Sequence, residues 1–292
     1  MLDLRRLRLL RELHSRGTIA AVADALQYTP SAVSQQLAIL EREAGVPLLE
    51  RAGRGVRLTD PALVLVEHAE ALLDRAAVAE AELAAAAGTV VGRGRIAGFQ
   101  SVAIRIALPA IEALAASAPG LRCELIEAEP EDALPALALG DLDLVLGDEW
   151  SHQPWRPAPA LTRVDLLEDP VRLVLPAGHP AGSIAELADA AWVASHPGMG
   201  WEEITQSVCR GQGGFDPQIR HRANNATVAL ELVARGHAVA LLPELALRRR
   251  ADGYVTRDVD GVVRTVYAAT RAADAARPST QALLAAVTAA AR

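Results

Sequence analysis

Apolar residues in the first part of the chain recur with the spacing of short amphipathic helices. Leucines occupy every third position from Leu4 to Leu13, arginines lie between them, and a glycine follows where this helix should end. Two further helices are expected over 19–26 and 31–45, because each pattern begins at a threonine that can serve as an N-cap. The segment 46–59 contains two short extended stretches around an arginine- and glycine-rich turn. The pattern therefore predicts three helices followed by a hairpin, or wing.

A longer helical pattern runs without a breaker over residues 61–87. At ~1.5 Å per residue, this helix extends about 40 Å. Its apolar stripe must be buried on another surface, and a second copy of the chain is favoured over the alternative of folding back on its own domain. The stripe consists of Leu63, Val66, Leu73, Val78 and Leu83.

Beyond a flexible joint at 88–94, short apolar runs alternate with helical patterns. About seven strands and five helices in this part predict an α/β domain with two small parallel sheets covered on both faces. The prolines between 154 and 159 mark the expected crossing between two lobes. The expected boundaries are 1–60 for the winged helix-turn-helix, 61–88 for the linker helix, 89–292 for the α/β domain, 89–162 with 271–292 for its first lobe, and 163–270 for its second.

Composition adds a charge asymmetry. The chain has 292 residues and a net charge of −7, but its first sixty residues hold nine arginines against seven acidic residues. Because the first sixty residues are slightly basic and the rest of the chain is acidic, the charge distribution weakly indicates an anionic partner for the N-terminal part. The chain has no lysine, which we attribute to coding bias, so every cationic phosphate contact must come from a guanidinium group.

Other features narrow the class of protein. Cys123 and Cys209 lie far apart, and two unrelated core thiols are favoured over a redox pair. The N-terminus lacks the apolar core of a signal peptide and no run suits a membrane span, so a soluble cytoplasmic protein is expected. No nucleophile elbow, phosphate loop, metal-spaced cluster or cofactor motif is present. The sequence therefore argues against an enzyme, and the helix-turn-helix argues against a solute-binding receptor.

Three helices and a wing are the plan of the winged helix-turn-helix, whose third helix enters the DNA major groove. Serine and glutamine side chains can bond to base edges, a proline can touch a thymine methyl, and arginines can hold phosphates or a minor groove. The candidate DNA-binding residues are Thr18, Thr29, Pro30, Ser31, Ser34, Gln35, Arg51, Arg54 and Arg57.

Residues 1–60 resemble the LysR-type transcriptional regulators. The resemblance rests on the run SAVSQQLAILEREAGVPLLERAGRGVRLT, which carries the family's pattern at Ser34, Leu40-Glu41, Gly45, Leu48, Arg51 and Leu58-Thr59. The order and length of the remaining segments agree with the family. The resemblance implies a linker helix followed by a bilobal domain, similar to the type 2 periplasmic binding proteins, with an effector cleft between its lobes.

The third helix departs from the family's pattern. Gln35 replaces a common arginine, Ala38 and Ile39 replace positions that are often basic, and Leu49 replaces the usual phenylalanine. With fewer cationic side chains on this helix, we expect weaker phosphate anchoring there and a greater dependence on the wing.

Effector-binding candidates follow from the rule that ligands of α/β sheets bind beyond the carboxyl ends of strands, near helix N-termini. Hydroxyls at Ser101 and Thr227 suit a carboxylate, although Thr227 is equally well explained as a plain N-cap and His196 as a loop residue. Asp148 and Glu129 favour a cationic or hydroxyl group. Trp150, Trp155 and Trp201 can wall the cleft or serve packing. The candidates are Gln100, Ser101, Glu129, Gly147, Asp148, Ser195, His196, Gly198, Asn225 and Thr227.

The partners expected from this interpretation are double-stranded promoter DNA and a small-molecule effector, with a carboxylate-bearing compound as one option. The linker helix predicts a homodimer, and the family resemblance implies a homotetramer. Two alternatives stay open: a repressor that ignores small molecules and keeps a vestigial cleft, and, less favoured, a solute-binding receptor.

Overall fold

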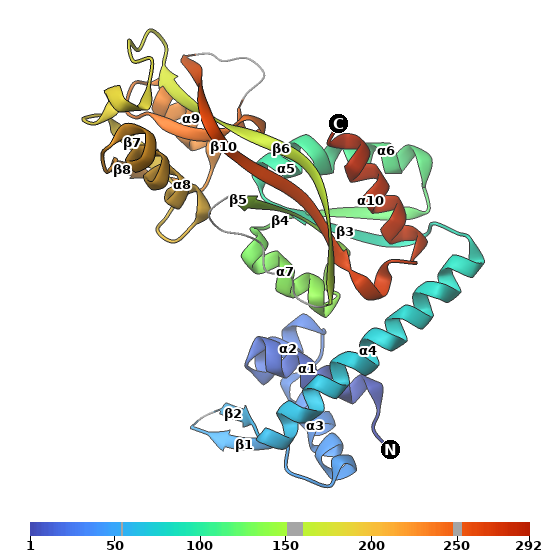
Figure 1. Ribbon diagram of the computed structural model, residues 1–292. Coiled ribbons are helices and arrows are strands. Elements are labelled where there is room, and N and C mark those ends of the chain that lie inside the picture. The colour runs from blue at the N-terminus through green and yellow to red at the C-terminus, as the bar shows by residue number, and fades with distance from the viewer. Residues whose placement is uncertain (54, 151–159, 248–252) are drawn as a thin grey trace. The chain divides into compact units, whose positions relative to one another are not determined.

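The computed structural model describes residues 1–53, 55–150, 160–247 and 253–292. The chain divides into two compact units, Met1–Gly88 and Thr89–Arg292, each with its own core (Figure 1). Arg54 and Trp155, both named as candidates from the sequence, lie outside the described residues, as does the proline-rich segment at 154–159.

The N-terminal unit contains four helices and a two-stranded hairpin among its described residues. The elements are α1 (Leu4–Arg16), α2 (Ile19–Ala25), α3 (Pro30–Ala44), β1 (Leu49–Ala52), β2 (Gly55–Leu58) and α4 (Asp60–Ala87). The hairpin is antiparallel, with Leu49 opposite Leu58. The winged helix-turn-helix predicted from the sequence is confirmed.

Local capping explains where these helices begin and end. The hydroxyls of Thr18, Thr29 and Thr59 each accept a hydrogen bond from the backbone N–H three residues later. Gly17 and Gly45 follow α1 and α3 in the left-handed conformation that favours glycine. The first and last residues of these helices are therefore set by cap residues that can be recognised in the sequence.

The core of the N-terminal unit forms where the apolar faces of its helices meet. Leu10, Val33 and Leu40 are fully buried in it, and the first half of α4 joins them through Ala62 and Val66. Val66 was expected on a stripe facing a second copy, but it packs inside its own domain instead.

The C-terminal unit is a mixed α/β domain. Its strands are β3 (Gly92–Gly98), β4 (Leu121–Glu127), β5 (Leu144–Trp150), β6 (Leu161–Pro176), β7 (Ala191–Ala194), β8 (Gln218–Arg222), β9 (Ala240–Pro243) and β10 (Tyr254–Arg271). Its helices are α5 (Gln100–Val102), α6 (Leu108–Ser117), α7 (Pro130–Leu139), α8 (Gly200–Val208), α9 (Ala226–Ala234) and α10 (Pro278–Ala290). A π-helical turn joins α5 to α6 just before Pro109, whose missing N–H cannot continue a regular α-helix.

The expectation of two separate parallel sheets is wrong. Six strands form one mixed sheet in the order β4-β3-β5-β10-β6-β9, and among the described residues of this unit β7 and β8 form a separate pair. Strands β6 and β10 run antiparallel for most of their 16 and 18 residues and are shared by both ends of the domain (Figure 1). Their polar halves carry aspartates and arginines in place of apolar runs, so the sequence pattern indicated only the apolar half of each.

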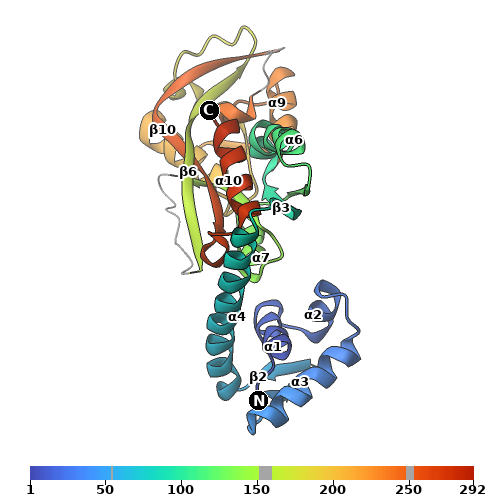
Figure 2. The same ribbon diagram turned by 90° about the vertical axis from the view of Figure 1, so that its right-hand side faces the viewer.

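Helices cover both faces of this sheet near β3 and β5. Leu144 and Leu146 pack with Leu283 of α10, while the intervening Val145 packs with Leu137 of α7. Because side chains alternate along a strand, α10 and α7 lie on opposite faces. Figure 2 shows α6 beside α10.

Candidate functional site

The start of α3 presents an exposed polar surface. Pro30, Ser31, Ser34 and Gln35 are all exposed, whereas Val33 is buried on the opposite side. The hydroxyl of Ser34 donates to the carbonyl of Pro30 at 3.0 Å, and the hydroxyls of Ser31 and Thr29 lie 3.0 Å apart. These bonds orient the hydroxyls while leaving lone pairs directed outward, so the surface can accept and donate hydrogen bonds.

Glu41 ties the wing to one flank of α3. Its Oε1 accepts hydrogen bonds from the backbone N–H groups of Leu48 and Leu49 at 2.8 and 3.0 Å. Arg51 and Arg57 are exposed on the hairpin, and Arg57 pairs with Glu50 at the surface. Since exposed ion pairs are weak, Arg57 can exchange this partner for a phosphate.

The other flank of α3 is held by α1, which the sequence analysis did not connect to the site. Arg6 bonds to Gln36 at 3.0 Å and to Glu43 at 2.6 Å. Arg5 and Arg8, both exposed, lie beside this contact and line a pocket of about 580 Å³ in the N-terminal unit. The arginine repeat of the first helix was visible in the sequence, but its position beside α3 depends on the packing of the two helices.

Thr18, the remaining candidate in this unit, is exposed and caps α2 by accepting from the N–H of Ala21 at 3.1 Å.

A cavity of about 260 Å³ opens in the C-terminal unit where several helices begin. Residues at or near the starts of α5, α7, α8 and α9 line it, together with the ends of β5 and β9 and the middle of β10. Five of the ten candidate effector-binding residues lie in this lining: Gln100, Ser101, Glu129, Asp148 and Ser195. Half of the residues selected by the rule that ligands bind beyond strand ends therefore lie in one cavity, although they are far apart in the sequence.

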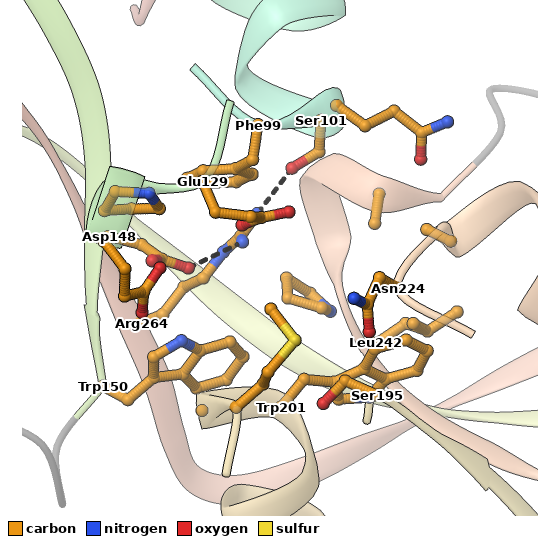
Figure 3. A pocket seen from close by; sticks show the side chains of 18 of the residues that line it. Phe99, Ser101, Glu129, Asp148, Trp150, Ser195, Trp201, Asn224, Leu242 and Arg264 are labelled. Atoms are coloured by element: carbon orange, nitrogen blue, oxygen red, sulfur yellow. Dashed lines mark hydrogen bonds and ion pairs between the residues drawn. The ribbon is translucent and has the colours of Figure 1, made fainter. Parts of the chain in front are cut away.

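Arg264 occupies the centre of the cavity's polar side (Figure 3). Its guanidinium bonds to Asp169 at 2.7 and 2.8 Å, to Asp148 at 3.1 Å and to Ser101 at 2.9 Å. It also lies over the rings of Phe99 and Trp150, with centroids at 5.0 and 5.8 Å. With a residue exposure of only 4%, it is a buried charge balanced by buried carboxylates.

Two of the carboxyl groups near Arg264 have raised pKa values. Burial, reinforced by Asp148 and Glu131, raises the pKa of Glu129 to about 7, and Arg264 opposes the shift only in part. Burial also raises the pKa of Asp148, against the opposing effect of Arg264. The cavity therefore holds more carboxyl groups than the single guanidinium can balance.

The other five candidates lie outside the lining and make structural contacts. Gly147 lies against the ring of Tyr267, where a Cβ would fall 2.5 Å from ring atoms. The N–H of His196 donates to Asn224 at 3.1 Å, and that of Gly198 donates to Glu202 at 3.1 Å. Asn225 and Thr227 were also candidates. Asn225 caps α9 by accepting from the N–H of Thr227 at 2.8 Å, while the Thr227 hydroxyl meets Gln100 Nε2 at 3.4 Å.

Arg264 was not predicted from the sequence, and Trp150 and Trp201 were left undecided, although all three line the cavity. A signal for Arg264 was present, because Val262, Arg264 and Val266 alternate on the buried face of one strand. An arginine on the buried face of a strand must have a buried partner. Here the partner is Asp169 of β6, and the sequence pattern does not show that β6 pairs with β10.

Replacing Glu129 with glutamine should raise the stability of the domain at high pH. Since the folded-state pKa lies near 7 and the ordinary value is 4.5, the folded protein retains a proton between these values that the unfolded chain releases, so stability falls as pH rises through this window. The full shift corresponds to about 3 kcal/mol, which solvent exposure of the half-buried carboxyl reduces to about 1–2 kcal/mol.

Urea unfolding of wild type and Glu129→Gln should show this gain at about pH 8 and little difference near pH 4.5. Glu112→Gln, at an exposed position of α6, is the matched control and should change stability at neither pH. A gain of equal size at both pH values would contradict the raised pKa.

A winged helix-turn-helix joined to an α/β domain with a ligand-sized cavity defines a DNA-binding transcriptional regulator with an effector-binding domain. Two family profiles match the chain: residues 4–63 match the bacterial regulatory helix-turn-helix protein, lysR family, and residues 87–292 match the LysR substrate binding domain. The chain belongs to the LysR family of transcriptional regulators, and it is a regulator rather than an enzyme.

Several transcriptional regulators are similar to this chain over most of their own length. The transcriptional regulator MetR of Salmonella typhimurium is 27% identical over 97% of this chain and 89% of its own. A probable hydrogen peroxide-inducible genes activator of Mycobacterium avium is 31% identical over 78% of this chain and 73% of its own. Among solved structures, a full-length OxyR variant from Pseudomonas aeruginosa has a TM-score of 0.71 at 21% identity, covering 99% and 98% of the two chains. Full-length CbnR in complex with its target DNA has a TM-score of 0.54 at 22% identity over both whole chains.

Two absences hold for the described ranges. No helix there combines the length and the apolar character needed to cross a membrane. Within the same ranges, no group of three histidine, cysteine, aspartate or glutamate residues is placed to hold a metal ion.

Proposed function

We propose that the start of α3 reads operator bases in the major groove while both of its flanks grip the DNA backbone. The supporting observation is the shared exposure of Ser31, Ser34 and Gln35 on the face opposite Val33. Pro30 adds an apolar contact, and Thr18 and Thr29 place helix N-termini near phosphates. Backbone contacts come from Arg51, Arg54 and Arg57 on the wing and from Arg5 on α1, which lies on the other flank.

We propose that a small molecule in the cavity modulates this DNA binding. The chain contributes cavity residues from 99–150 and from 195–246, which belong to the two lobes expected within 89–292, and a ligand that contacts both shifts the population of their arrangements. The cavity is smaller than the ~300–1,000 Å³ of sites for drug-sized ligands, so a small metabolite fits best. The test is to measure operator affinity in the presence of a panel of small metabolites and their analogues. If none of these compounds changes the affinity, the regulator acts without an effector.

The regulator is proposed to act in the cytoplasm as a dimer through the linker helix, assigned to 61–88, and as a tetramer through further contacts of the α/β domain. Leu72 and Leu83 of α4 are exposed large apolar residues on this helix, which supports a second copy as its partner. We propose no thiol switch, since burial raises the pKa of Cys209 to about 12 and the thiolate is the reactive form.

Footprinting of the protein across its own genome tests the central proposal. We expect a small set of specific sites, and replacing Gln35 with alanine should weaken operator binding by about 1–3 kcal/mol, or roughly 5- to 150-fold. Affinity for non-operator DNA should change by less than about twofold, because Gln35 carries no charge. If the affinities for operator and non-operator DNA fall by the same factor, Gln35 supports the structure of the domain and does not contact the bases.

Replacing Arg51 with alanine should make operator binding less dependent on salt. Each phosphate contact releases about one counterion, so the slope of log affinity against log salt should become shallower by about one unit. Binding of wild type and variant to a labelled operator fragment over a salt series measures the slope. Arg75→Ala, on an exposed position of α4 away from the wing, should leave it unchanged, and an unchanged slope for Arg51→Ala would remove this residue from the interface.

A further inference from the structure

The cavity has an excess of negative charge in the part of the chain that the structure describes. Arg264 is the cationic side chain of its described lining, and Asp148, Glu129 and Glu131 share that lining with it. Asp169 lies directly behind Arg264 and binds it with two short contacts. One guanidinium thus faces four carboxyl groups, of which two already neutralise it.

Arg264 is poorly placed to anchor a carboxylate effector. Its Nε and Nη2 groups are directed at Asp169, Nη1 at Asp148, and Nη2 also at Ser101. An incoming carboxylate would have to displace Asp148, which would leave a buried carboxylate without its partner. The guanidinium therefore serves to hold the carboxylates in position.

Two of the four helix N-termini at the cavity, those of α8 and α9, are also engaged by the protein itself. The hydroxyl of Ser195 accepts from the N–H of Glu202 at 2.9 Å, and the Glu202 carboxylate accepts from the N–H of Gly198 at 3.1 Å, both at the start of α8. At the start of α9, Asn225 accepts from the N–H of Thr227. These internal acceptors occupy donors that an anionic ligand would otherwise use.

Two carboxyl groups remain for a ligand, and since Glu131 is exposed, Glu129 is the one held inside the cavity. It is half-buried at the N-cap position of α7, its side chain points toward the middle of the cavity beside Arg264, and Asp148 approaches the same centre from another side (Figure 3). A cation placed here would relieve the repulsion between neighbouring carboxylates, which a neutral or anionic ligand would not do.

Aromatic rings supply the apolar part of the same site. Trp150 and Trp201 line the cavity, and the indole N–H of Trp201 is fixed by donation to the carbonyl of Leu241 at 2.6 Å. The Trp201 ring, held in this way, presents a π-face, which attracts cations, and both rings present apolar area, which binds a hydrocarbon body.

We propose that the effector of this site is a small organic cation, whose ammonium or amidinium group is bound by Glu129 and Asp148 and whose apolar body packs against Trp150 and Trp201. The inference rests on the proposed function of the cavity and names the chemical class of its ligand. A carboxylate on the same molecule is compatible with it, but a cationic group is required.

Two matched probe series test the requirement for positive charge: phenethylamine, 2-phenylethanol and 3-phenylpropionate, and hexylamine, 1-hexanol and hexanoate. Each is titrated into the full-length protein at about pH 8, where Glu129 is ionised, with calorimetry and melting temperature as readouts. In at least one series we expect the amine to bind at least roughly tenfold more tightly than the alcohol and the acid.

Two variants then test whether Glu129 is the carboxylate that binds the ammonium group. Glu129→Gln should weaken binding of the amine by roughly tenfold or more and leave the alcohol unchanged. Glu127→Gln removes a carboxyl group at the end of β4, two residues before Glu129, that does not line the cavity, and its effect on the amine should stay within about twofold. This comparison separates direct contact from a general electrostatic field.

The outcomes are distinct. Preference for the acids, binding without charge selectivity, or no binding of either amine at millimolar concentration would overturn the inference, as would an unchanged amine affinity in Glu129→Gln. Amine binding that responds to Glu129 but does not change operator affinity would uphold the ligand class and remove the proposed regulatory function.

Discussion

Replacing Arg264 with methionine is expected to lower the free energy of unfolding of the C-terminal domain by roughly 3–5 kcal/mol. The substitution leaves Asp169, with a residue exposure of 2%, and the largely buried Asp148 without their positive partner. Methionine fills a similar volume, so the loss of stability comes from the unpaired carboxylates and not from an empty space in the core. The stack of the guanidinium on Phe99 and Trp150 is lost as well.

Calorimetry of the full chain measures this effect as a lower melting temperature of one of its transitions. Adding Asp169→Asn to Arg264→Met removes one unpaired charge and should restore part of the loss. Arg257→Met, at an exposed position of the same strand, is the matched control and should change stability by less than about 0.5 kcal/mol. A loss below about 1 kcal/mol for Arg264→Met would mean that water reaches both aspartates.

The second large effect is expected in the N-terminal domain, where Glu41→Ala should detach the wing from α3. One oxygen of this side chain accepts from two backbone N–H groups, at Leu48 and Leu49, and Leu48 is buried. Hydrogen bonds to a charged acceptor contribute about 1.5–3 kcal/mol each, so a loss of about 2–4 kcal/mol is expected after partial rehydration of the freed groups. Operator affinity should fall with it, because Arg51 loses its fixed position beside the recognition helix.

The graded variant Glu41→Gln keeps an acceptor oxygen without the charge, and it should cost about 1 kcal/mol. Glu67→Ala, on an exposed position of α4, controls for a general change in charge. The readouts are calorimetric stability of the full chain and operator affinity. If Glu41→Ala lowers neither, the wing is held by its apolar contacts alone.

Local signals in the sequence determined most of the N-terminal domain. The threonines at 18, 29 and 59 and the glycines at 17 and 45 mark helix ends because capping involves residues only a few positions apart. The long helix α4 was also predicted within one residue of its observed bounds. Its burial was less predictable, since Val66 packs on α1 of its own domain and no local pattern records that contact.

The cavity residues divide in the same way. Ser101, Glu129 and Asp148 could be proposed from the sequence because they follow apolar strands or begin helices, where ligands of α/β domains bind. Arg264 lies in the middle of a strand, far from any such end. Its partners come from β5 and β6, and the register of three strands, with Arg264 opposite both Trp150 and Asp169, brings them together.

The sequence by itself determined the class of each domain, the caps, the helix α3 and the presence of acidic groups near the cavity, since each depends on neighbouring residues or on hydrophobic period. Only the tertiary structure decided that the two long strands β6 and β10 join the two ends of the α/β domain, that Glu41 ties the wing to α3, and that Arg264 is already neutralised. These contacts join residues 7 to 163 positions apart. Their free energy depends on packing, register and burial, which the local pattern does not contain.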